Sequence, residues 1–324
     1  MYTSVNADYK NDLQSWNAID DQLKHIAEKG FTHVSWMFDW DGEFMYTLPE
    51  MLQAKQALRE YGLIAHTLHA DHGGQRGFYV KGEWNPTPGQ RCTFARKEFT
   101  NHNDLVRLGG VDLLINRIEL CSHIGAHEMI LHLQLPWQHF RENPDNKKDY
   151  YECAFKSLDA VQPLAKAAGV RIDIENFFNT PEEDEIEKYN LLFDRYDDDF
   201  IGMCFDSGHA SLTFLDNPYT LLEMFPERVH ATHLQDNELI DPKYVLKDFK
   251  KVANSDLHIL PYTGKLDWDR LARGVAKSAV ELPADFEVGF YGKTKEEEEK
   301  WLDDCYNASV RFHNDVIKYR EQGK

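Results

Sequence analysis

The stretch "MCFDSGHA", residues 203–210, places an aspartate and a histidine three residues apart at the end of an apolar run. A short apolar run that ends in Asp-Ser-Gly is typical of a buried strand followed by a turn. Asp206 and His209 are therefore either ordinary turn residues or a pair that binds a metal ion. The choice depends on whether other strands of the chain end in the same kind of residue.

Further apolar runs alternate with segments of helical period along the whole chain. The predicted strands are 2–7, 33–38, 63–68, 128–133, 170–175, 201–206, 229–234 and 284–290. Predicted helices lie between them, for example at 15–30, 48–62 and 151–169, and the last helix covers 296–320. Such alternation predicts an α/β fold with a parallel sheet, and this number of units closes a (β/α)8 TIM barrel. An open, doubly wound sheet would give a similar pattern. Because no linker-like stretch divides the chain, we expect a single domain over residues 1–324.

Composition restricts the classes of partner. The formal charge of the 324-residue chain is −19, from 55 acidic against 36 basic residues, and such a field disfavours nucleic acid. The run "KTKEEEEK" at 293–300 is expected to be a solvated helix start. No apolar run approaches the ~18 residues of a membrane helix, and the N-terminus lacks a signal-peptide pattern. With five scattered cysteines and no Cys-x-x-Cys pair, these features predict a cytoplasmic protein.

Acids and histidines gather at the predicted strand ends, where a parallel barrel carries its functional groups. These residues, with two from the loop after the seventh strand, are Glu175, Asp206, Asp256, Glu287, His69, His132, His209, His233 and His258. One such residue alone would be explained by a buried pairing, but several buried like charges are costly unless a cation neutralises them. We therefore interpret Asp206 as a metal ligand and His209 as a site residue. The ligand mixture suits Mn²⁺, Co²⁺, Mg²⁺ or Zn²⁺.

Two further features have both a functional and an ordinary interpretation. The irregular segment 70–92 is either a lid over a site or a surface loop. Five aromatic residues form either apolar walls around a substrate or ordinary core packing: Trp36, Phe38, Trp137, Phe177 and Phe178.

Several short motifs occur in one order over roughly residues 60–290: "IENFFN", "DSGHA", "HLQDN", "HILPYTGKLDW" and a glutamate in the last strand. In these the chain resembles the sugar isomerase/epimerase superfamily, whose xylose isomerase-like TIM barrel is shared with the four-type apurinic endonucleases. The resemblance implies a divalent metal ion held by Glu175, Asp206, His233 and Glu287, with Glu175 and Glu287 moving the proton. It implies substrate contacts from His69, His132, His209, Asp256 and His258.

Two departures from the family pattern are visible. The turn "PYTG" at 261–264 replaces a glycine-rich P-G-x-G turn, and the second predicted strand lacks the acidic ending typical of the family. We therefore do not transfer the family's conformation to that loop or to the wall of the site next to the second predicted strand.

The resemblance implies a metal-dependent sugar isomerase or epimerase of carbohydrate metabolism, which acts on a small sugar or polyol. Homo-dimers and tetramers are common in that family, and the sequence leaves the oligomeric state open. The reaction would transfer a proton next to a ketose carbonyl through a metal-stabilised enediolate. The alternatives are a lyase of the inosose dehydratase type, a trinuclear-zinc phosphodiesterase resembling the endonucleases, and a non-catalytic sugar-binding barrel. All nine metal-ligand positions of the endonucleases carry an acid or histidine here, so more than one ion is compatible with the sequence. The negative charge and the lack of an Arg/Lys cluster in the strand-end loops weigh against a DNA substrate.

Overall fold

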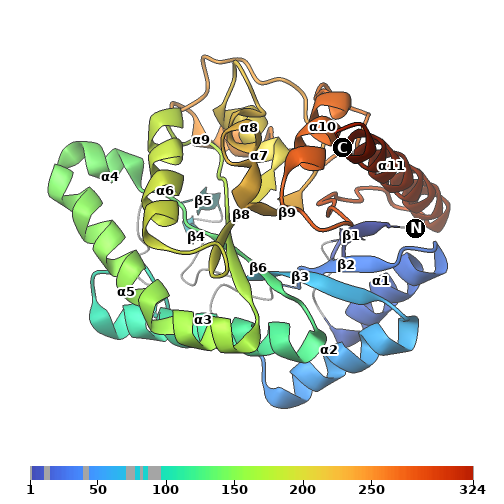
Figure 1. The fold of residues 1–324 in the computed structure, drawn as a ribbon, viewed down its shortest axis with the longest axis horizontal. Helices are drawn as coiled ribbons and strands as arrows, with labels where there is room; N and C mark the ends of the chain where they lie inside the picture. The colour runs from blue at the N-terminus through green and yellow to red at the C-terminus, as the bar shows by residue number, and fades with distance from the viewer. Residues whose placement is uncertain are drawn as a thin grey trace.

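A computed structural model describes residues 2–10, 15–38, 44–70, 77–80, 83–86 and 96–323. Its main sheet is entirely parallel and curls on itself (Figure 1). In spatial order the strands are β1 (Ser4–Asn6), β2 (His33–Trp36), β3 (Ile64–Ala70), β6 (Glu128–His132), β7 (Arg171–Glu175), β8 (Ile201–Asp206) and β9 (Val229–His233). The first seven predicted strands are thus confirmed, each to within two residues at either end.

The helices of the described residues are α1 (Trp16–Glu28), α2 (Leu48–Tyr61), α3 (Asp104–Ile124), α4 (Trp137–Glu142), α5 (Pro144–Ala168), α6 (Glu182–Arg195), α7 (Ser207–Thr213), α8 (Thr220–Met224), the 3-10 helix η1 (Pro226–Arg228), α9 (Phe249–Ala253), α10 (Trp268–Lys277) and α11 (Lys295–Gln322). Long helices, among them α3, α5 and α11, cover the outside of the curled sheet (Figure 1). None of the described helices is both long enough and apolar enough to cross a membrane.

Local chemistry explains where the predicted helices end. Helices α2 and α5 stop at Gly62 and Gly169, whose φ angles of 68° and 67° lie in the left-handed region that glycine enters without strain. The acidic run 293–300 opens α11, where Thr294 and Glu297 form a reciprocal capping box. This confirms the interpretation of that run as a helix start.

The predicted eighth strand, 284–290, is a closing segment without regular strand pairing. On one side the Leu234 N–H donates to the Asp285 carbonyl at 2.9 Å, and on the other the Asn6 N–H donates to the Phe286 carbonyl at 2.9 Å. The regular ladder is interrupted because the Asp285 N–H donates to the Thr232 hydroxyl and the Val288 N–H to the Asn6 side chain. The segment still joins β9 to β1, so the described residues form a TIM-barrel fold.

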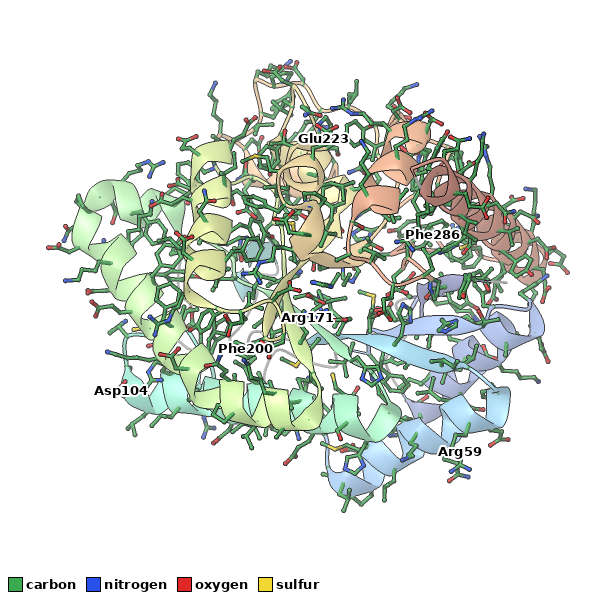
Figure 2. All side chains as sticks on the ribbon, viewed as in Figure 1. Arg59, Asp104, Arg171, Phe200, Glu223 and Phe286 are labelled. Atoms are coloured by element: carbon green, nitrogen blue, oxygen red, sulfur yellow. The ribbon has the colours of Figure 1, made fainter. Side chains whose placement is uncertain are left out.

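Helix α11 covers this closing segment from outside. Phe286 is fully buried beside α11 (Figure 2), and its ring centroid lies 5.9 Å from that of Phe312. His313, also on α11, accepts a hydrogen bond from the Ala284 N–H at 2.8 Å. The C-terminal helix therefore holds the segment that completes the ring.

The candidate lid, 70–92, lies mostly outside the described residues. Within it, the backbone of β4 (Gly77–Val80) pairs with that of β5 (Glu83–Pro86) as an antiparallel hairpin.

Candidate functional site

The nine predicted side chains converge at the carboxyl ends of the strands, because all the strands run in the same direction. His69, His132, Glu175 and His233 lie on β3, β6, β7 and β9, and Asp206 is the last residue of β8. The other four are on α7, in the loop after β9, and on the closing segment: His209, Asp256, His258 and Glu287.

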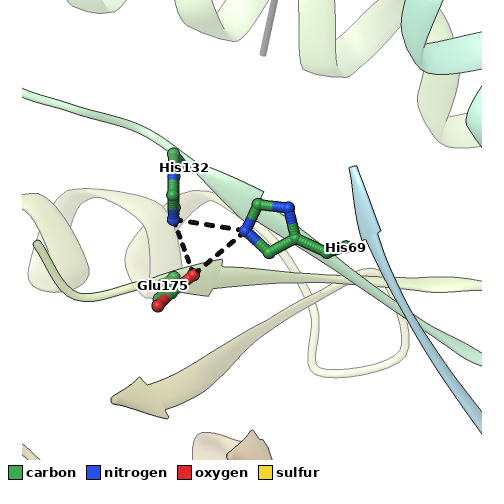
Figure 3. A group of neighbouring side chains, drawn as sticks. All are labelled: His69, His132 and Glu175. Carbon is green, nitrogen blue, oxygen red and sulfur yellow. Dashed lines mark hydrogen bonds and ion pairs between the residues drawn. The ribbon is translucent and has the colours of Figure 1, made fainter. Parts of the chain in front are cut away.

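Glu175 lies at the centre of the cluster and is about 1% exposed. Its Oε2 is 2.7 Å from His132 Nε2 and 3.6 Å from His69 Nε2, and the two imidazole nitrogens are 3.4 Å apart (Figure 3). Its Oε1 lies 3.1 Å from His233 Nδ1 and 3.3 Å from His209 Nδ1. One carboxylate therefore connects two separate groups of imidazoles.

Glu175, Asp206, His233 and Glu287 form a quartet in which one ligand atom from each residue lies within 4.8 Å of the others. His233 Nδ1 faces both Glu175 Oε1, at 3.1 Å, and Glu287 Oε2, at 3.2 Å. A single imidazole nitrogen can donate only one hydrogen. His233 Nδ1 can therefore donate to only one of these two buried oxygens, whereas a divalent cation could be bound by both. The quartet therefore fits a metal ion.

Two other groups of donors flank the quartet. His69, His132 and Glu175 also offer atoms that lie within 4.8 Å of one another. On the other side, Asp256 Oδ2 is 3.2 Å from His209 Nε2 and 3.1 Å from His258 Nε2. The second oxygen of Asp256 is buried and has no hydrogen-bond partner among the described residues. The arrangement offers donors for more than one ion.

Burial and contacts with neighbouring charged groups shift the pKa values of the acidic residues in the site. Burial, with the nearby carboxylates of Glu175 and Glu287, raises the pKa of Asp206 to about 8, although His209 opposes the shift. Burial would also raise the pKa of Glu175 and Glu287, but His233 and other imidazoles outweigh it and hold both below their usual range. The neighbouring carboxylates in turn raise the pKa of His209 and His233 above its usual range, although burial alone would lower it.

Asn176, of the "IENFFN" motif, ties the ends of two neighbouring strands together. Its side-chain amide donates to the Asp206 carbonyl at 2.9 Å, and its oxygen accepts from the Asp206 N–H at 2.8 Å. The Asp206 carboxylate in turn accepts the His209 N–H at 2.6 Å and caps α7. The "DSGHA" stretch is thus both a helix start and a part of the cluster, so the two interpretations of this turn coexist.

A buried ion pair lies directly behind Glu175. Lys188 and Glu185, both on α6, are fully buried, and Lys188 Nζ is 2.5 Å from Glu185 Oε1. Lys188 also donates to the Glu175 carbonyl at 3.3 Å, while Glu185 accepts the Phe177 N–H at 3.0 Å. The pair holds the backbone on both sides of the end of β7.

The "HLQDN" motif attaches the loop after β9 to the cluster. The Gln235 amide donates to Asp206 at 3.3 Å, and its oxygen accepts the His258 N–H at 2.8 Å. The Asn237 oxygen accepts the Leu257 N–H at 2.8 Å. In the sequence this motif served only to identify the family resemblance. In the structure its side chains position residues 256–258.

The unusual "PYTG" turn keeps a conformation that glycine normally adopts. Tyr262, which stands at the second position of this turn, has φ 69°. Its ring packs 5.1 Å from Trp268 and lies 3.8 Å below the Arg311 guanidinium carbon. These contacts offset the strain of a non-glycine residue in the left-handed region.

Of the five aromatic residues with two interpretations, two line the site and two are core. The rings of Phe177 and Phe178 lie 5.2 and 5.1 Å from His209. Trp36 and Phe38 are buried in the main hydrophobic core, and Trp137 donates its indole N–H to the Asn179 carbonyl. Residues 39–43, where the family's acidic strand ending would be sought, lie outside the described residues.

Sequence reasoning missed Asp8, a half-buried carboxylate in the loop after β1. It shares a cavity of about 390 Å³ with His258 and Glu287. Burial raises its pKa to about 6, opposed by a hydrogen bond from Asn6 and reinforced by Glu287. The available signal was its position: "SVNAD" places an acid just after a strand, as "MCFD" does.

Comparison with known proteins gives the same fold. The model of the family described as xylose isomerase-like TIM barrel matches residues 23–305. An uncharacterized protein, y4fM of Sinorhizobium fredii (strain NBRC 101917 / NGR234), is 32% identical over 273 residues, which are 83% of this chain and 82% of that protein.

Two solved structures illustrate the similarity. D-psicose 3-epimerase, in the presence of D-fructose, superposes with a TM-score of 0.67 at 14% identity, covering 98% of this chain and 99% of that one. The IolI protein with a bound zinc atom superposes with a TM-score of 0.59 at 14% identity, covering 98% and 99%. At these identities the two structures establish a shared fold.

Proposed function

Because this chain belongs to the xylose isomerase-like TIM barrel family, we propose that it is a divalent-metal-dependent sugar isomerase or epimerase. The quartet carries the proposal: three carboxylates and one imidazole, from four neighbouring parts of the ring, offer their atoms to one point. The barrel shared with a ketose epimerase supports the class of reaction. The quartet residues would hold the ion.

In the proposed reaction, Glu175 and Glu287 exchange a proton with the carbon next to the ketose carbonyl. Both carboxylates lie within 3.2 Å of His233 Nδ1, and a carboxylate in this position can accept a proton from carbon. One carboxylate takes the proton from carbon, and the electron pair of the broken C–H bond enters an enediolate. The other carboxyl group, or the same one, returns a proton to carbon. A divalent cation, when bound, supplies Lewis-acid stabilisation of the developing negative charge.

The remaining side chains would bind and enclose the sugar. His69, His132, His209, Asp256 and His258 surround the two glutamates and offer hydrogen bonds to hydroxyl groups. The rings of Phe177 and Phe178, stacked with centroids 4.6 Å apart, would exclude water from one side. The cytoplasmic location expected from the sequence stays a prediction, and the oligomeric state stays open.

Deuterium exchange tests the proposed reaction. The Mn²⁺-loaded protein is incubated with free ketohexoses in D₂O, and deuterium at the carbon next to the carbonyl is measured by NMR. We expect uptake with the parent protein and a loss of at least about 100-fold in Glu287→Gln, since general acid–base catalysis contributes this much. Equal exchange by both proteins on every sugar would remove Glu287 from the mechanism. Loss of water from the substrate, in place of exchange, would assign the lyase alternative.

A trinuclear phosphodiesterase is the second candidate, because donor groups flank the quartet on both sides. Metal content per chain distinguishes the two functions, measured by elemental analysis on the parent, Glu175→Ala and Asp256→Asn. One metal ion per chain, lost in Glu175→Ala and kept in Asp256→Asn, supports the isomerase. Three ions, with fewer in Asp256→Asn, support the hydrolase, and cleavage of abasic DNA then becomes the decisive assay.

A further inference from the structure

The cavity beside Glu287 and His258 extends the site away from the metal quartet toward β1. Its volume, about 390 Å³, lies within the range of small-molecule pockets of about 300 to 1,000 Å³. Asp8, Lys10 and Tyr291 are among the side chains that line it. A sugar bound at the quartet by its carbonyl end would place its remaining carbons in this space.

Asp8 is held in a fixed position on the wall of this cavity. Its Oδ1 accepts a hydrogen bond from the Asn6 side-chain amide at 2.8 Å. The oxygen of that amide accepts the Val288 N–H at 2.9 Å, next to Glu287 on the closing segment. Within the described part of the chain, Asn6 is the one other side chain that hydrogen-bonds Asp8. As far as the described residues go, the rest of the carboxylate keeps its capacity to accept hydrogen bonds from a ligand.

The charge of this wall opposes anions. Lys10 is the one lysine or arginine among the described lining residues, and two carboxylates already neutralise it: Glu298 at 2.6 Å and Asp21 at 3.0 Å. The imidazole of His258 is paired with Asp256 at 3.1 Å. Among the described residues, a phosphate or carboxylate in the cavity would thus meet the Asp8 carboxylate without an unpaired lysine or arginine. Hydroxyl groups, in contrast, can donate to Asp8.

We propose that this cavity is a subsite for the hydroxyl-bearing carbons of a neutral, unphosphorylated ketose, and that Asp8 is the residue that selects it. The inference rests on the proposed function and narrows its substrate class. Asp8 accepts hydrogen bonds from hydroxyl groups remote from the reacting carbon, and its negative charge disfavours phosphorylated sugars. Hydrogen bonds to a charged group of this kind account for about a 10- to 100-fold difference in affinity.

The test compares D-fructose with D-fructose 6-phosphate on the Mn²⁺-loaded protein by titration calorimetry and by deuterium exchange. We expect the parent to bind D-fructose at least 10-fold more tightly than the phosphate. Asp8→Asn should weaken D-fructose binding about 10-fold and raise its KM in exchange, reduce the preference over the phosphate, and retain its metal content. Asp197→Asn is the matched control, because it removes the same charge from an exposed side chain before β8, at the opposite end of the strands.

The outcomes separate the two proposals. If the parent exchanges deuterium into D-fructose and Asp8→Asn matches it in affinity, KM and preference, the subsite assignment is overturned while the proposed function stands. Tighter binding of D-fructose 6-phosphate than of D-fructose by the parent protein also overturns the subsite assignment. If the metal-loaded parent neither binds nor exchanges either sugar, both proposals fail for ketohexoses.

Discussion

Replacing Lys188 by methionine should both destabilise the fold and loosen Glu175. The lysine and Glu185 are fully buried, and their charged atoms are 2.5 Å apart. At an effective dielectric constant of about 20, two unit charges at this distance attract by about 6 to 7 kcal/mol, much of it offset by the desolvation of both groups. Lys188→Met leaves the Glu185 carboxylate buried without a counter-charge. Breaking a buried pair in this way costs about 3 to 5 kcal/mol.

The expected change in melting temperature follows from the length of the chain. Unfolding entropy of about 2.1 cal/mol/K per residue over 324 residues converts the loss into about 4 to 7 °C, measured by calorimetry on metal-free protein. Because Lys188 also donates to the Glu175 carbonyl at 3.3 Å, Mn²⁺ affinity should fall about 10- to 100-fold, measured by titration calorimetry.

A double variant provides the control. The Phe177 N–H donates to Glu185 Oε1 at 3.0 Å, and Glu185→Gln keeps an oxygen that can accept this bond. The same substitution removes the negative charge that Lys188→Met leaves without a partner. Lys188→Met with Glu185→Gln should therefore recover a large part of the lost stability without restoring metal affinity. A loss below about 1 kcal/mol in Lys188→Met, or a double variant less stable than the single one, would refute this account of the pair.

Three other predictions concern the barrel itself. His313 is buried and its pKa is lowered to about 4, against 6.5 for the free side chain, so the unfolded chain binds the extra proton between these values. The free energy of unfolding should fall by up to about 3 kcal/mol as pH drops from 6.5 to 4, and urea unfolding of His313→Gln should show a shallower dependence. A Cβ at Gly202 would lie 2.1 Å from Asp173 Oδ1, so Gly202→Ala should cost about 1 to 3 kcal/mol in urea unfolding, whereas Gly323→Ala, at the end of α11, should cost almost nothing. Asn176→Leu leaves the buried N–H and carbonyl of Asp206 without their partner and should lower the free energy of unfolding by about 2 kcal/mol or more; an unchanged melting curve would contradict this.

The sequence predicted much of the fold because its signals are local. Apolar runs of strand length, glycines in helix caps and an acidic first turn act over a few residues, and the element boundaries follow them closely. The closing segment 284–290 departs from its prediction because its pairing depends on partners far away in the chain. Thr232 and Asn6 provide side-chain acceptors for N–H groups that a regular strand would pair with backbone.

The chemistry of the site divides in the same way. The sequence by itself determined which residue types stand at the strand ends, and since parallel strands end at one edge, it determined that these side chains meet. It could not determine how they are grouped, because distances among side chains from different strands depend on the curvature of the whole sheet. Only the tertiary structure decided that Glu175 connects two groups of imidazoles, that Lys188 lies behind it, and that Asp8, which follows the first strand, faces a cavity beside Glu287 on the last segment.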